Sequence, residues 1–537
     1  FQMRFDIKLF LLAVVLHEAA AYKILVYNVK FGHSHSNYMG LVADTLAEAG
    51  HNVTSLVPII DPFLKDGTTK SKVIHVPQDP RIVESVDVMN GKSKNAGPDF
   101  WEMKMNFIAA FFVSRLFRDM FCPQCETTLS HPGLVEQLRN EHFDVVLSEN
   151  FDFCGTGLAH AIGAPLIVVS TSSIFEHISQ DIGMPLVPSF NPSYTISNFD
   201  LHSLWSRMEN VYHTLMSTQM WRPAEHCIDG VFKTKFGADY PTVSEQTANS
   251  AFVLTNSEPF IDFARPLLRK VVDLGGIGVK APKPLDKHWN GVLSLRKQTV
   301  LVSFGSIAKS YTMTIERKRA LVTMFARFPE ITFIWKYEMP EDEFSKNETA
   351  KLKNVILSKW MPQSDLLNDP RLTAFVSHAG MGSCQEVAAR GIPTLFIPLF
   401  GDQPRNAAMM QYNGLALAID KFDALDADKL TDAVQRLISS DSIRANAKKS
   451  AAMLARKPFA PKELLIKHVE FAAEFGVPKS LIPRGLQLGW IEYFLVDVIL
   501  VALTAILLLT SLILFVTVKI VRRIFGVQKI SQKVKKN

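Results

Sequence analysis

The chain is 537 residues long, 47% of its residues are hydrophobic, and its formal net charge at pH 7 is +6. This length is sufficient for two domains, each with a full hydrophobic core. The excess positive charge is local, because residues 519–537 contain seven Lys and Arg residues and no acidic residue, so the composition does not call for a nucleic-acid partner.

The N-terminus has the pattern of a secretory signal peptide. Arg4 and Lys8 flank an apolar run at residues 9–16, and three alanines at residues 19–21 offer a cleavage site. We therefore predict a signal peptide over residues 1–21.

The next segment predicts a strand, a loop, a helix and a second strand. Residues 22–29 and 53–57 are short apolar runs, and apolar residues at helical spacing predict a helix over residues 37–48. The loop before that helix contains His33 and His35. Such a loop faces the ligand crevice of a parallel α/β sheet, where a neutral imidazole suits a general base acting on a hydroxyl. The alternative is that both histidines are ordinary surface residues.

A carboxylate follows a later strand. Residues 143–148 have the pattern of a buried strand that ends at Glu149, and Asp152 lies nearby. A carboxylate in this position can orient an imidazole and stabilise its protonated form.

The middle of this first domain is irregular. Residues 60–135 and 173–245 are rich in Phe, Met and Trp, which is typical of an apolar acceptor pocket or a membrane-facing surface, and equally of ordinary core. Cys122 and Cys125 form a CxxC motif, which raises thiol redox chemistry or zinc binding. The motif lacks a strand–CxxC–helix setting and a second CxxC pair, so we expect neither.

A linker at residues 275–288, rich in Gly, Pro and Lys, predicts a boundary between two α/β domains, at residues 22–280 and 281–455. The second domain opens with a strong strand at residues 299–304, and a Gly-Ser turn that contains Ser306 follows it. A strand, turn and helix in this order can bind phosphate, although any doubly wound fold contains the same order.

Residues 360–403 carry the most information. Short apolar strands at residues 374–377 and 393–399 alternate with glycine-rich turns that open helices, which is the layout of a nucleotide site on a parallel sheet. His378 follows the first of these strands, and Gly380 lets backbone amides approach an anion closely. The alternative for a lone histidine is a hydrogen bond to a backbone carbonyl.

Other side chains in this stretch have two interpretations each. The Trp360 indole could stack on a base or pack at a strand end. Ser383 and Glu386 have the spacing of a capping box, which is a structural reason for both residues. Asp402 and Gln403 could together bind vicinal sugar hydroxyls, and Asp402 could instead cap a helix.

The order and spacing of ten positions in this stretch resemble the signature of the UDP-glycosyltransferases, the family that includes the UDP-glucuronosyltransferases: Trp360, Gln363, His378, Gly380, Ser383, Glu386, Gly391, Pro393, Asp402 and Gln403. The resemblance is to the membrane-bound animal branch. It implies an α/β GT-B fold, with two Rossmann-like domains facing a cleft. It also implies transfer of a sugar from UDP-glucuronate or UDP-glucose to a hydroxyl of a small lipophilic acceptor, with inversion and with no bound cofactor or metal.

The resemblance implies a role for each matched residue. It places Trp360 and Gln363 at the uracil, Glu386 at the ribose, Asp402 and Gln403 at the donor sugar, and His378, Gly380, Ser383 and the upstream Ser306 at the diphosphate. One departure is Gly382, because the family usually has Asn there. An Asn-mediated contact with the donor is therefore absent or replaced.

The resemblance also selects the catalytic base. His35 lies 15 residues before Gly50, which is the family's separation between its catalytic histidine and the following Gly-His pair, and His33 lacks this register. Glu149 stands where the family usually has Asp, with Asp152 as the alternative partner. A membrane-anchored lipophile-binding protein that has lost catalysis is the alternative function, and a thiol oxidoreductase is a third.

The C-terminal part predicts membrane anchoring. Residues 456–490 predict a helix that returns to the first domain and a juxtamembrane segment, and residues 494–518 predict a transmembrane helix, because about 20 apolar residues span a bilayer core of roughly 30 Å. The basic tail at residues 519–537 predicts a cytosolic C-terminus, and hence a single-pass type I protein with lumenal domains.

Lys533 and Lys535 resemble the K-x-K-x-x retrieval signal of endoplasmic-reticulum membrane proteins. The sequons at Asn52 and Asn347 are lumenal in this topology. The expected partners are a UDP-sugar, a small lipophilic acceptor and the lipid bilayer, without nucleic acid, and a homo-oligomer is left open.

Overall fold

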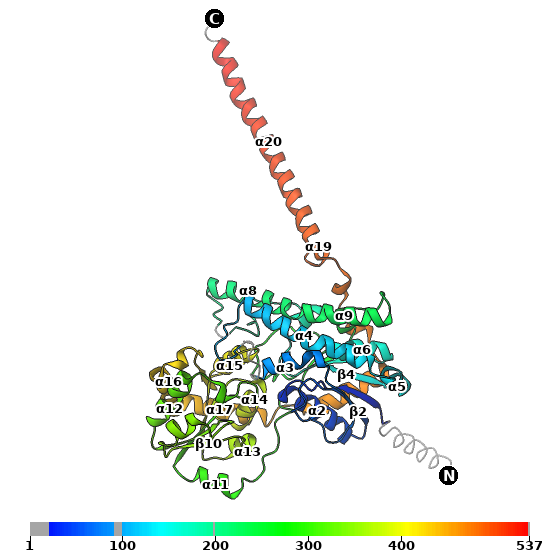
Figure 1. Cartoon of the computed structure of the whole chain (residues 1–537). Helices are drawn as coiled ribbons and strands as arrows, with labels where there is room; N and C mark the ends of the chain where they lie inside the picture. Colours follow the sequence, from blue (N-terminus) through cyan, green and yellow to red (C-terminus); the bar gives the residue numbers. More distant parts are fainter. Residues whose placement is uncertain (1–20, 91–98, 197–198, 535–537) are drawn as a thin grey trace, which may run out of the picture. The chain divides into compact units, whose positions relative to one another are not determined.

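The computed structural model describes residues 21–90, 99–196 and 199–534, so the predicted signal peptide lies outside the described residues except for its last position. Contacts within the chain define two compact units, Phe1–Leu481 and Ile482–Asn537. The first unit contains both sheets (Figure 1). The domain boundaries near residues 280 and 455 stay a prediction, because the contacts group both sheets together.

The first sheet contains seven parallel strands within the described residues, in the order β3-β2-β1-β4-β5-β6-β7. The strands are β1 (Lys23–Tyr27), β2 (Asn52–Pro58), β3 (Lys72–Val76), β4 (Val145–Glu149), β5 (Leu166–Ser170), β6 (Phe252–Thr255) and β7 (Val271–Asp273). The central strands β1, β4 and β5 are buried almost throughout, as expected for a parallel sheet covered on both faces.

The second sheet contains six parallel strands within the same described ranges, in the order β10-β9-β8-β11-β12-β13. The strands are β8 (Gln298–Ser303), β9 (Ile331–Lys336), β10 (Val355–Ser358), β11 (Leu372–Ser377), β12 (Thr394–Phe396) and β13 (Ala416–Ala418). Both sheets therefore have the strand order of a doubly wound fold, with the order reversing between β1 and β4 and between β8 and β11. Ligands bind outside the carboxyl ends of the strands at such points.

Helices cover both sheets. The first half of the chain contains α2 (His33–Glu48), α3 (Val83–Met89), α4 (Phe107–Ser130), α5 (Leu134–Asn140), α6 (Cys154–Ile162), α7 (Glu176–Asp181), α8 (Leu204–Met220), α9 (Arg222–Phe236) and α10 (Val243–Ala248). The second half contains α11 (Lys287–Leu293), α12 (Ile315–Ala326), α13 (Gln363–Asn368), α14 (Met381–Arg390), α15 (Gln403–Tyr412), α16 (Ala427–Ser439), α17 (Asp441–Leu454) and α18 (Pro461–Phe475).

Two predicted boundaries were wrong. The predicted loop with both histidines is helical, because α2 begins at His33 directly after Gly32, whose extended backbone (φ −135°, ψ 145°) forms the N-cap. The predicted strand at residues 393–399 is shorter, because Gln403 Oε1 accepts hydrogen bonds from the backbone amides of Leu399 and Phe400 and holds them in a loop.

Helix α18 packs on the first sheet after the chain has passed through the second. Leu465, Val469 and Ala472 are fully buried in the same cluster as Ile24 and Val26 of β1. The last long helix of the first unit therefore completes the core of the N-terminal sheet.

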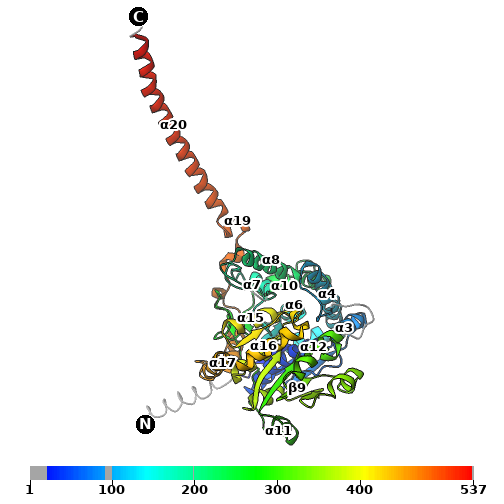
Figure 2. The same cartoon turned by 90° about the vertical axis from the view of Figure 1, so that its left-hand side faces the viewer.

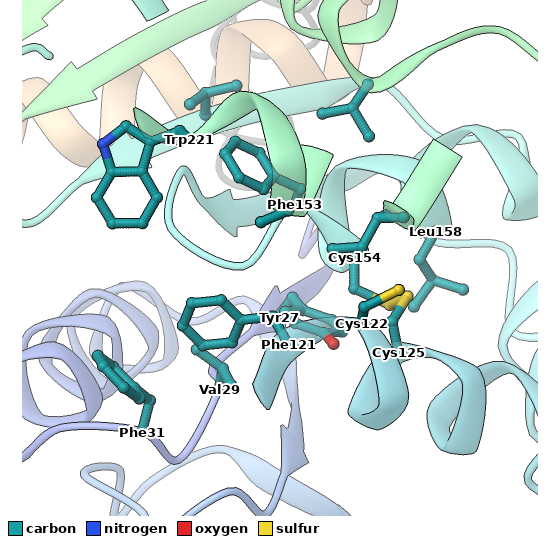
Figure 3. Packing of buried hydrophobic residues seen from close by; sticks show 14 of the residues in the cluster. Tyr27, Val29, Phe31, Phe121, Cys122, Cys125, Phe153, Cys154, Leu158 and Trp221 are labelled. Atoms are coloured by element: carbon teal, nitrogen blue, oxygen red, sulfur yellow. A yellow bond between two sulfur atoms is a disulfide. The ribbon is translucent and has the colours of Figure 1, made fainter. Parts of the chain in front are cut away.

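Two cysteines in one turn of α4 form disulfides with two other helices. Cys122 is bonded to Cys227 of α9, and Cys125 is bonded to Cys154 of α6, while Cys384 is a buried free thiol. Figure 3 shows Cys122, Cys125 and Cys154 together with apolar side chains of this core, such as Phe121 and Leu158. The CxxC cysteines are thus separate structural links and not a bonded pair.

The second unit contains a short helix, α19 (Trp490–Tyr493), and a long one, α20 (Val496–Val534). Leu495 separates them with a left-handed backbone (φ 54°), so the long helix begins two residues after the predicted residue 494. Its segment Val496–Phe525 is long and apolar enough to cross a bilayer.

Candidate functional site

The reversal point of the first sheet brings together a histidine and a carboxylate. His35 lies in the first turn of α2, after β1, and Glu149 is the last residue of β4. The distance from His35 Nδ1 to Glu149 Oε1 is 2.5 Å, and the side chains are 16% and 2% exposed. Thr171, just after β5, donates to Glu149 Oε1 at 2.8 Å and lies 3.1 Å from His35 Nδ1.

This pairing fixes the chemistry of the imidazole. Because Nδ1 faces the carboxylate, the proton of a neutral ring resides on Nδ1 and the lone pair of Nε2 is available to a substrate. Burial lowers the pKa of His35, but the charge and hydrogen bond of Glu149, together with the charge of Asp402, outweigh it and raise this pKa above its ordinary value. The arrangement is suited to general base catalysis.

The alternative candidates face other groups. Asp152 accepts a hydrogen bond from the backbone amide of Cys154 at 2.9 Å, and burial raises the pKa of its carboxyl to about 7. The ring of His33 lies edge-on to the Trp360 indole, with 5.7 Å between centroids. Burial first, and then the charge of Lys336, lower the pKa of His33.

Aromatic side chains surround the proposed base. The Phe151 and Phe31 rings lie 4.7 and 5.8 Å from the His35 ring, and Phe151 also contacts Trp221 at 4.5 Å. Phe117 contacts Trp221 as well, at 4.9 Å. Phe31 and Trp221 are visible in Figure 3. An apolar molecule would therefore find aromatic contacts beside His35.

The reversal point of the second sheet holds His378 between two glycines. A Cβ atom on Gly305 or Gly380 would lie 2.6 or 2.7 Å from His378 Nε2, and Gly305 also has a left-handed backbone (φ +83°). Burial, and then the charge of Lys336, lower the pKa of His378 to about 4, so the ring is neutral near pH 7. Ser306 lies in the same turn after β8.

We expect Gly305→Ala to lower the free energy of unfolding by about 1–3 kcal/mol, because alanine is strained at this φ and its methyl group meets the His378 ring. Gly382 in the first turn of α14 is the matched control, since a Cβ there would meet no heavy atom within 4 Å. Thermal melting of both variants is the measurement. Equal melting temperatures for Gly305→Ala and Gly382→Ala would contradict the steric argument.

Glu386 is not part of a capping box. Helix α14 begins at Met381 with Gly380 as its N-cap, so Ser383 lies inside the first turn and Glu386 one turn later. Glu386 accepts hydrogen bonds from Gln363 Nε2 at 2.7 Å and from Ser364 Oγ at 2.6 Å. Gln363 also donates to Ser383 at 3.3 Å, so these side chains form one polar cluster.

The Trp360 indole is 64% exposed, so packing at a strand end does not explain it. Lys336 Nζ lies 5.4 Å from its ring centroid. An exposed indole beside the polar cluster of Gln363, Ser383 and Glu386 offers a stacking surface for a flat ligand.

Asp402 and Gln403 differ in what they can offer a sugar. Asp402 Oδ2 accepts hydrogen bonds from Asn406 Nδ2, at 2.8 Å, and from Ser172 Oγ. Asp402 is the N-cap residue of α15, but its side chain makes no capping hydrogen bond. The Gln403 carbonyl oxygen is used by the loop, so only its amide NH₂ group can contact a sugar hydroxyl.

The two sheets approach each other at these strand ends. Ser172 follows β5 and bonds to Asp402, and His33 contacts Trp360. Gln385 of α14 donates to the backbone carbonyl of Asn256 at 2.6 Å. The histidine–carboxylate pair therefore faces the loop that carries Asp402, and the described residues contain no group of three or more metal-ligating side chains.

Comparisons with known proteins agree with this architecture. A sequence model described as UDP-glucoronosyl and UDP-glucosyl transferase matches residues 22–537. UDP-glucuronosyltransferase 3A1 of Bos taurus is 28% identical, over 91% of this chain and 92% of that protein, and UDP-glucuronosyltransferase 3A2 of Homo sapiens is 28% identical over 90% of each.

Solved structures show the same fold. Phytolacca americana UGT2, complexed with UDP-2-fluoro-glucose and pterostilbene, matches with a TM-score of 0.55 at 14% sequence identity, over 84% of this chain and 100% of that chain. The fold is thus the GT-B fold, with two Rossmann-like sheets. The family model spans nearly the whole sequence, and the chain belongs to the family of UDP-glucuronosyl and UDP-glucosyl transferases.

Proposed function

We propose that this glycosyltransferase transfers glucuronate or glucose from its UDP-sugar to a hydroxyl group of a small lipophilic acceptor, with inversion at the anomeric carbon. The observation that carries the proposal is the 2.5 Å contact between His35 and Glu149 at the reversal point of the first sheet, opposite Asp402. The aromatic rings around His35 suit a lipophilic acceptor.

The reaction needs one proton transfer and one displacement. His35 Nε2 accepts the proton of the acceptor hydroxyl while the oxygen attacks the anomeric carbon from the face opposite UDP. The bond from that carbon to the diphosphate oxygen breaks, and UDP leaves with its electron pair. Glu149 stabilises the imidazolium that forms.

The second sheet provides the donor side of the proposal. Trp360 stacks on uracil with Gln363 nearby, Glu386 binds the ribose, and the N-terminus of α14 with Gly380 and Ser383 faces the diphosphate. His378 and Ser306 add neutral hydrogen-bonding groups to the diphosphate, and Asp402 and the Gln403 amide bind the sugar hydroxyls. Backbone amides and neutral donors stabilise the leaving group without a metal in this scheme.

The test is transfer itself. The full-length chain is incubated with radiolabelled UDP-glucuronate or UDP-glucose and a panel of phenols and sterols, and labelled glycoside is counted. Product that is lost in His35→Ala supports the proposal. Tight acceptor binding without any product in either donor series would favour the lipophile-binding alternative.

We expect Trp360→Ala to weaken UDP binding by about 1–3 kcal/mol, which is the size of base–aromatic stacking in other proteins. Calorimetric titration with UDP measures the loss. Trp360→Phe, which keeps an aromatic face, should recover most of the affinity. An unchanged affinity in Trp360→Ala would remove this residue from the uracil site.

We further propose that the enzyme is a single-pass type I protein of the endoplasmic-reticulum membrane, anchored by α20, with its catalytic unit in the lumen. The apolar length of α20 and the two disulfides, which persist in oxidising compartments, support the proposal. We expect the double substitution of Lys533 and Lys535 by Ser to let the chain leave the endoplasmic reticulum. Its glycans should then become resistant to endoglycosidase H, whereas unchanged glycans would contradict the retrieval role.

A further inference from the structure

Helix α8 has its apolar face on the outside of the protein and its more polar face on the inside. Its exposed apolar residues form one helical stripe: Leu204, Trp205, Met208, Val211, Tyr212 and Leu215, each 37–74% exposed. Its buried face is mostly polar: Asn210, Thr214, Ser217 and Thr218 lie inside and form hydrogen bonds with the protein, beside the buried methionines Met216 and Met220. A helix on a water-facing surface has the opposite arrangement.

The start of α4 extends this stripe. Phe107, Ile108, Phe111 and Phe112 are 55–69% exposed. The Phe107 ring packs edge-on against Tyr212 of α8 at 5.4 Å, and the Phe107 amide donates to Tyr212 Oη at 3.0 Å. These four residues and the α8 stripe are called the α4–α8 apolar surface here, and Figure 1 shows the two helices side by side. Isolated exposed apolar residues are normal, but a contiguous surface marks an interaction site.

The chemistry of this surface suits the interface of a lipid bilayer. Trp205 and Tyr212 carry an apolar ring with a polar tip, which is the type of side chain enriched at the boundary between lipid tails and head groups. Arg115, one helical turn from Phe111, holds its guanidinium 5.9 Å from the Phe111 ring centroid, and its exposed end can reach phosphate head groups. An apolar helical face with aromatic residues and a basic edge is typical of a helix that lies in a membrane surface.

The proposed anchor also limits how far this surface can move from a bilayer. Segment 482–495 joins the first unit to α20, and a fully extended segment of this length spans roughly 50 Å. Such a tether raises the effective concentration of lipid at the α4–α8 apolar surface. Even a weak contact with lipid is then formed for much of the time.

We propose that the α4–α8 apolar surface inserts into the lipid interface as a second membrane contact of this chain, separate from the spanning helix. The inference rests on the proposed anchoring by α20 and is independent of the proposed sugar transfer.

The test is fluorescence on the full-length chain, reconstituted in phosphatidylcholine vesicles. Met208→Cys, labelled with an environment-sensitive NBD probe, reports on the surface. Met339→Cys is the matched control, since both methionines are exposed (55% and 48%) and Met339 follows β9 in the second sheet. The native cysteines do not interfere, because four are disulfide-bonded and Cys384 is buried.

We expect the probe at residue 208 to emit at shorter wavelength, to be quenched by doxyl-labelled lipid, and to be several-fold less quenched by aqueous iodide than the probe at residue 339. Adding the substitution Trp205→Glu should make the probe at residue 208 accessible to iodide quenching again. Adding Trp205→Phe should leave the probe protected from iodide. Equal iodide quenching at both positions, with no doxyl quenching, overturns the proposal. A blue shift that grows with the number of protein copies per vesicle, without quenching by doxyl-labelled lipid, also overturns the proposal. It would show that a second copy of the chain covers the α4–α8 apolar surface.

Two further readings on the same vesicles separate the causes of failure. Extraction of the chain by alkaline carbonate would overturn the anchoring by α20 on which the inference rests. Glycoside formation with the same vesicles tests the sugar transfer, whose loss leaves the fluorescence result unaffected.

Discussion

Replacement of His35 by Ala is expected to lower kcat by about 10²–10⁴-fold, which is the usual contribution of a general base. The affinity for UDP should change little, because a base acts on the acceptor proton in the transition state and the proposed uracil, ribose and diphosphate contacts lie on the second sheet. Initial rates with a phenol acceptor and calorimetric titration with UDP measure the two quantities.

His33→Ala is the matched control, since this histidine lies in the same helical turn but faces Trp360 instead of Glu149. It should keep kcat within a few-fold of the wild-type value. If His33→Ala lost activity and His35→Ala kept it, the base would have to be reassigned to His33.

Substitution of Glu149 by Gln should have the second largest effect, a loss of roughly 10²–10⁴-fold in kcat, because the imidazolium formed during attack loses its anionic partner. The pH dependence gives a sharper result. The base must be deprotonated, and Glu149 raises the pKa of His35, so wild-type activity should rise with pH through a pKa above about 6.5. In Glu149→Gln this rise should move to lower pH.

Glu149→Asp is the control for this substitution. It keeps the charge and restores the residue that the family usually has, so this variant should retain much of the rate and a raised pKa of His35.

The pair of His35 and Glu149 also affects the stability of the fold. A histidine whose pKa is raised by folding stabilises the protein below its unfolded pKa of about 6.5, and this contribution is lost as pH rises through the folded pKa. An identical pH profile in wild type and Glu149→Gln would show that Glu149 is only a strand-end residue.

The fold and family could be predicted from the sequence because they depend on local patterns. Strands such as β1 and β11 are short apolar runs, and the glycine-containing turns after them can be recognised directly in the sequence. The two boundary errors have short-range causes. Gln403 accepts hydrogen bonds from the backbone amides of Leu399 and Phe400, which a pattern of apolar runs does not reveal. Gly32, a favoured N-cap residue, was a local signal for the start of α2 at His33.

Some residues around the proposed base were missed as well. Thr171 and Ser172 directly follow β5, so the rule that ligands lie beyond strand ends could have singled them out. Phe151 lies two residues beyond the end of β4, so the same rule could have singled it out, but its contacts with His35 and Trp221 depend on where α2 and the junction of α8 and α9 place those side chains. The disulfide partners of Cys122 and Cys125 likewise depend on distant helices.

The return of α18 to the first sheet has a consequence for biosynthesis. The side chains that complete one face of that sheet, Leu465, Val469 and Ala472, are translated only after the whole second sheet. At 5–20 residues per second, the ribosome needs roughly 10–40 s to go from the end of the first sheet to α18. During that interval a nascent chain presents an uncovered apolar face, so we expect it to depend on a chaperone, and a ribosome stalled before residue 461 to leave this half protease-sensitive.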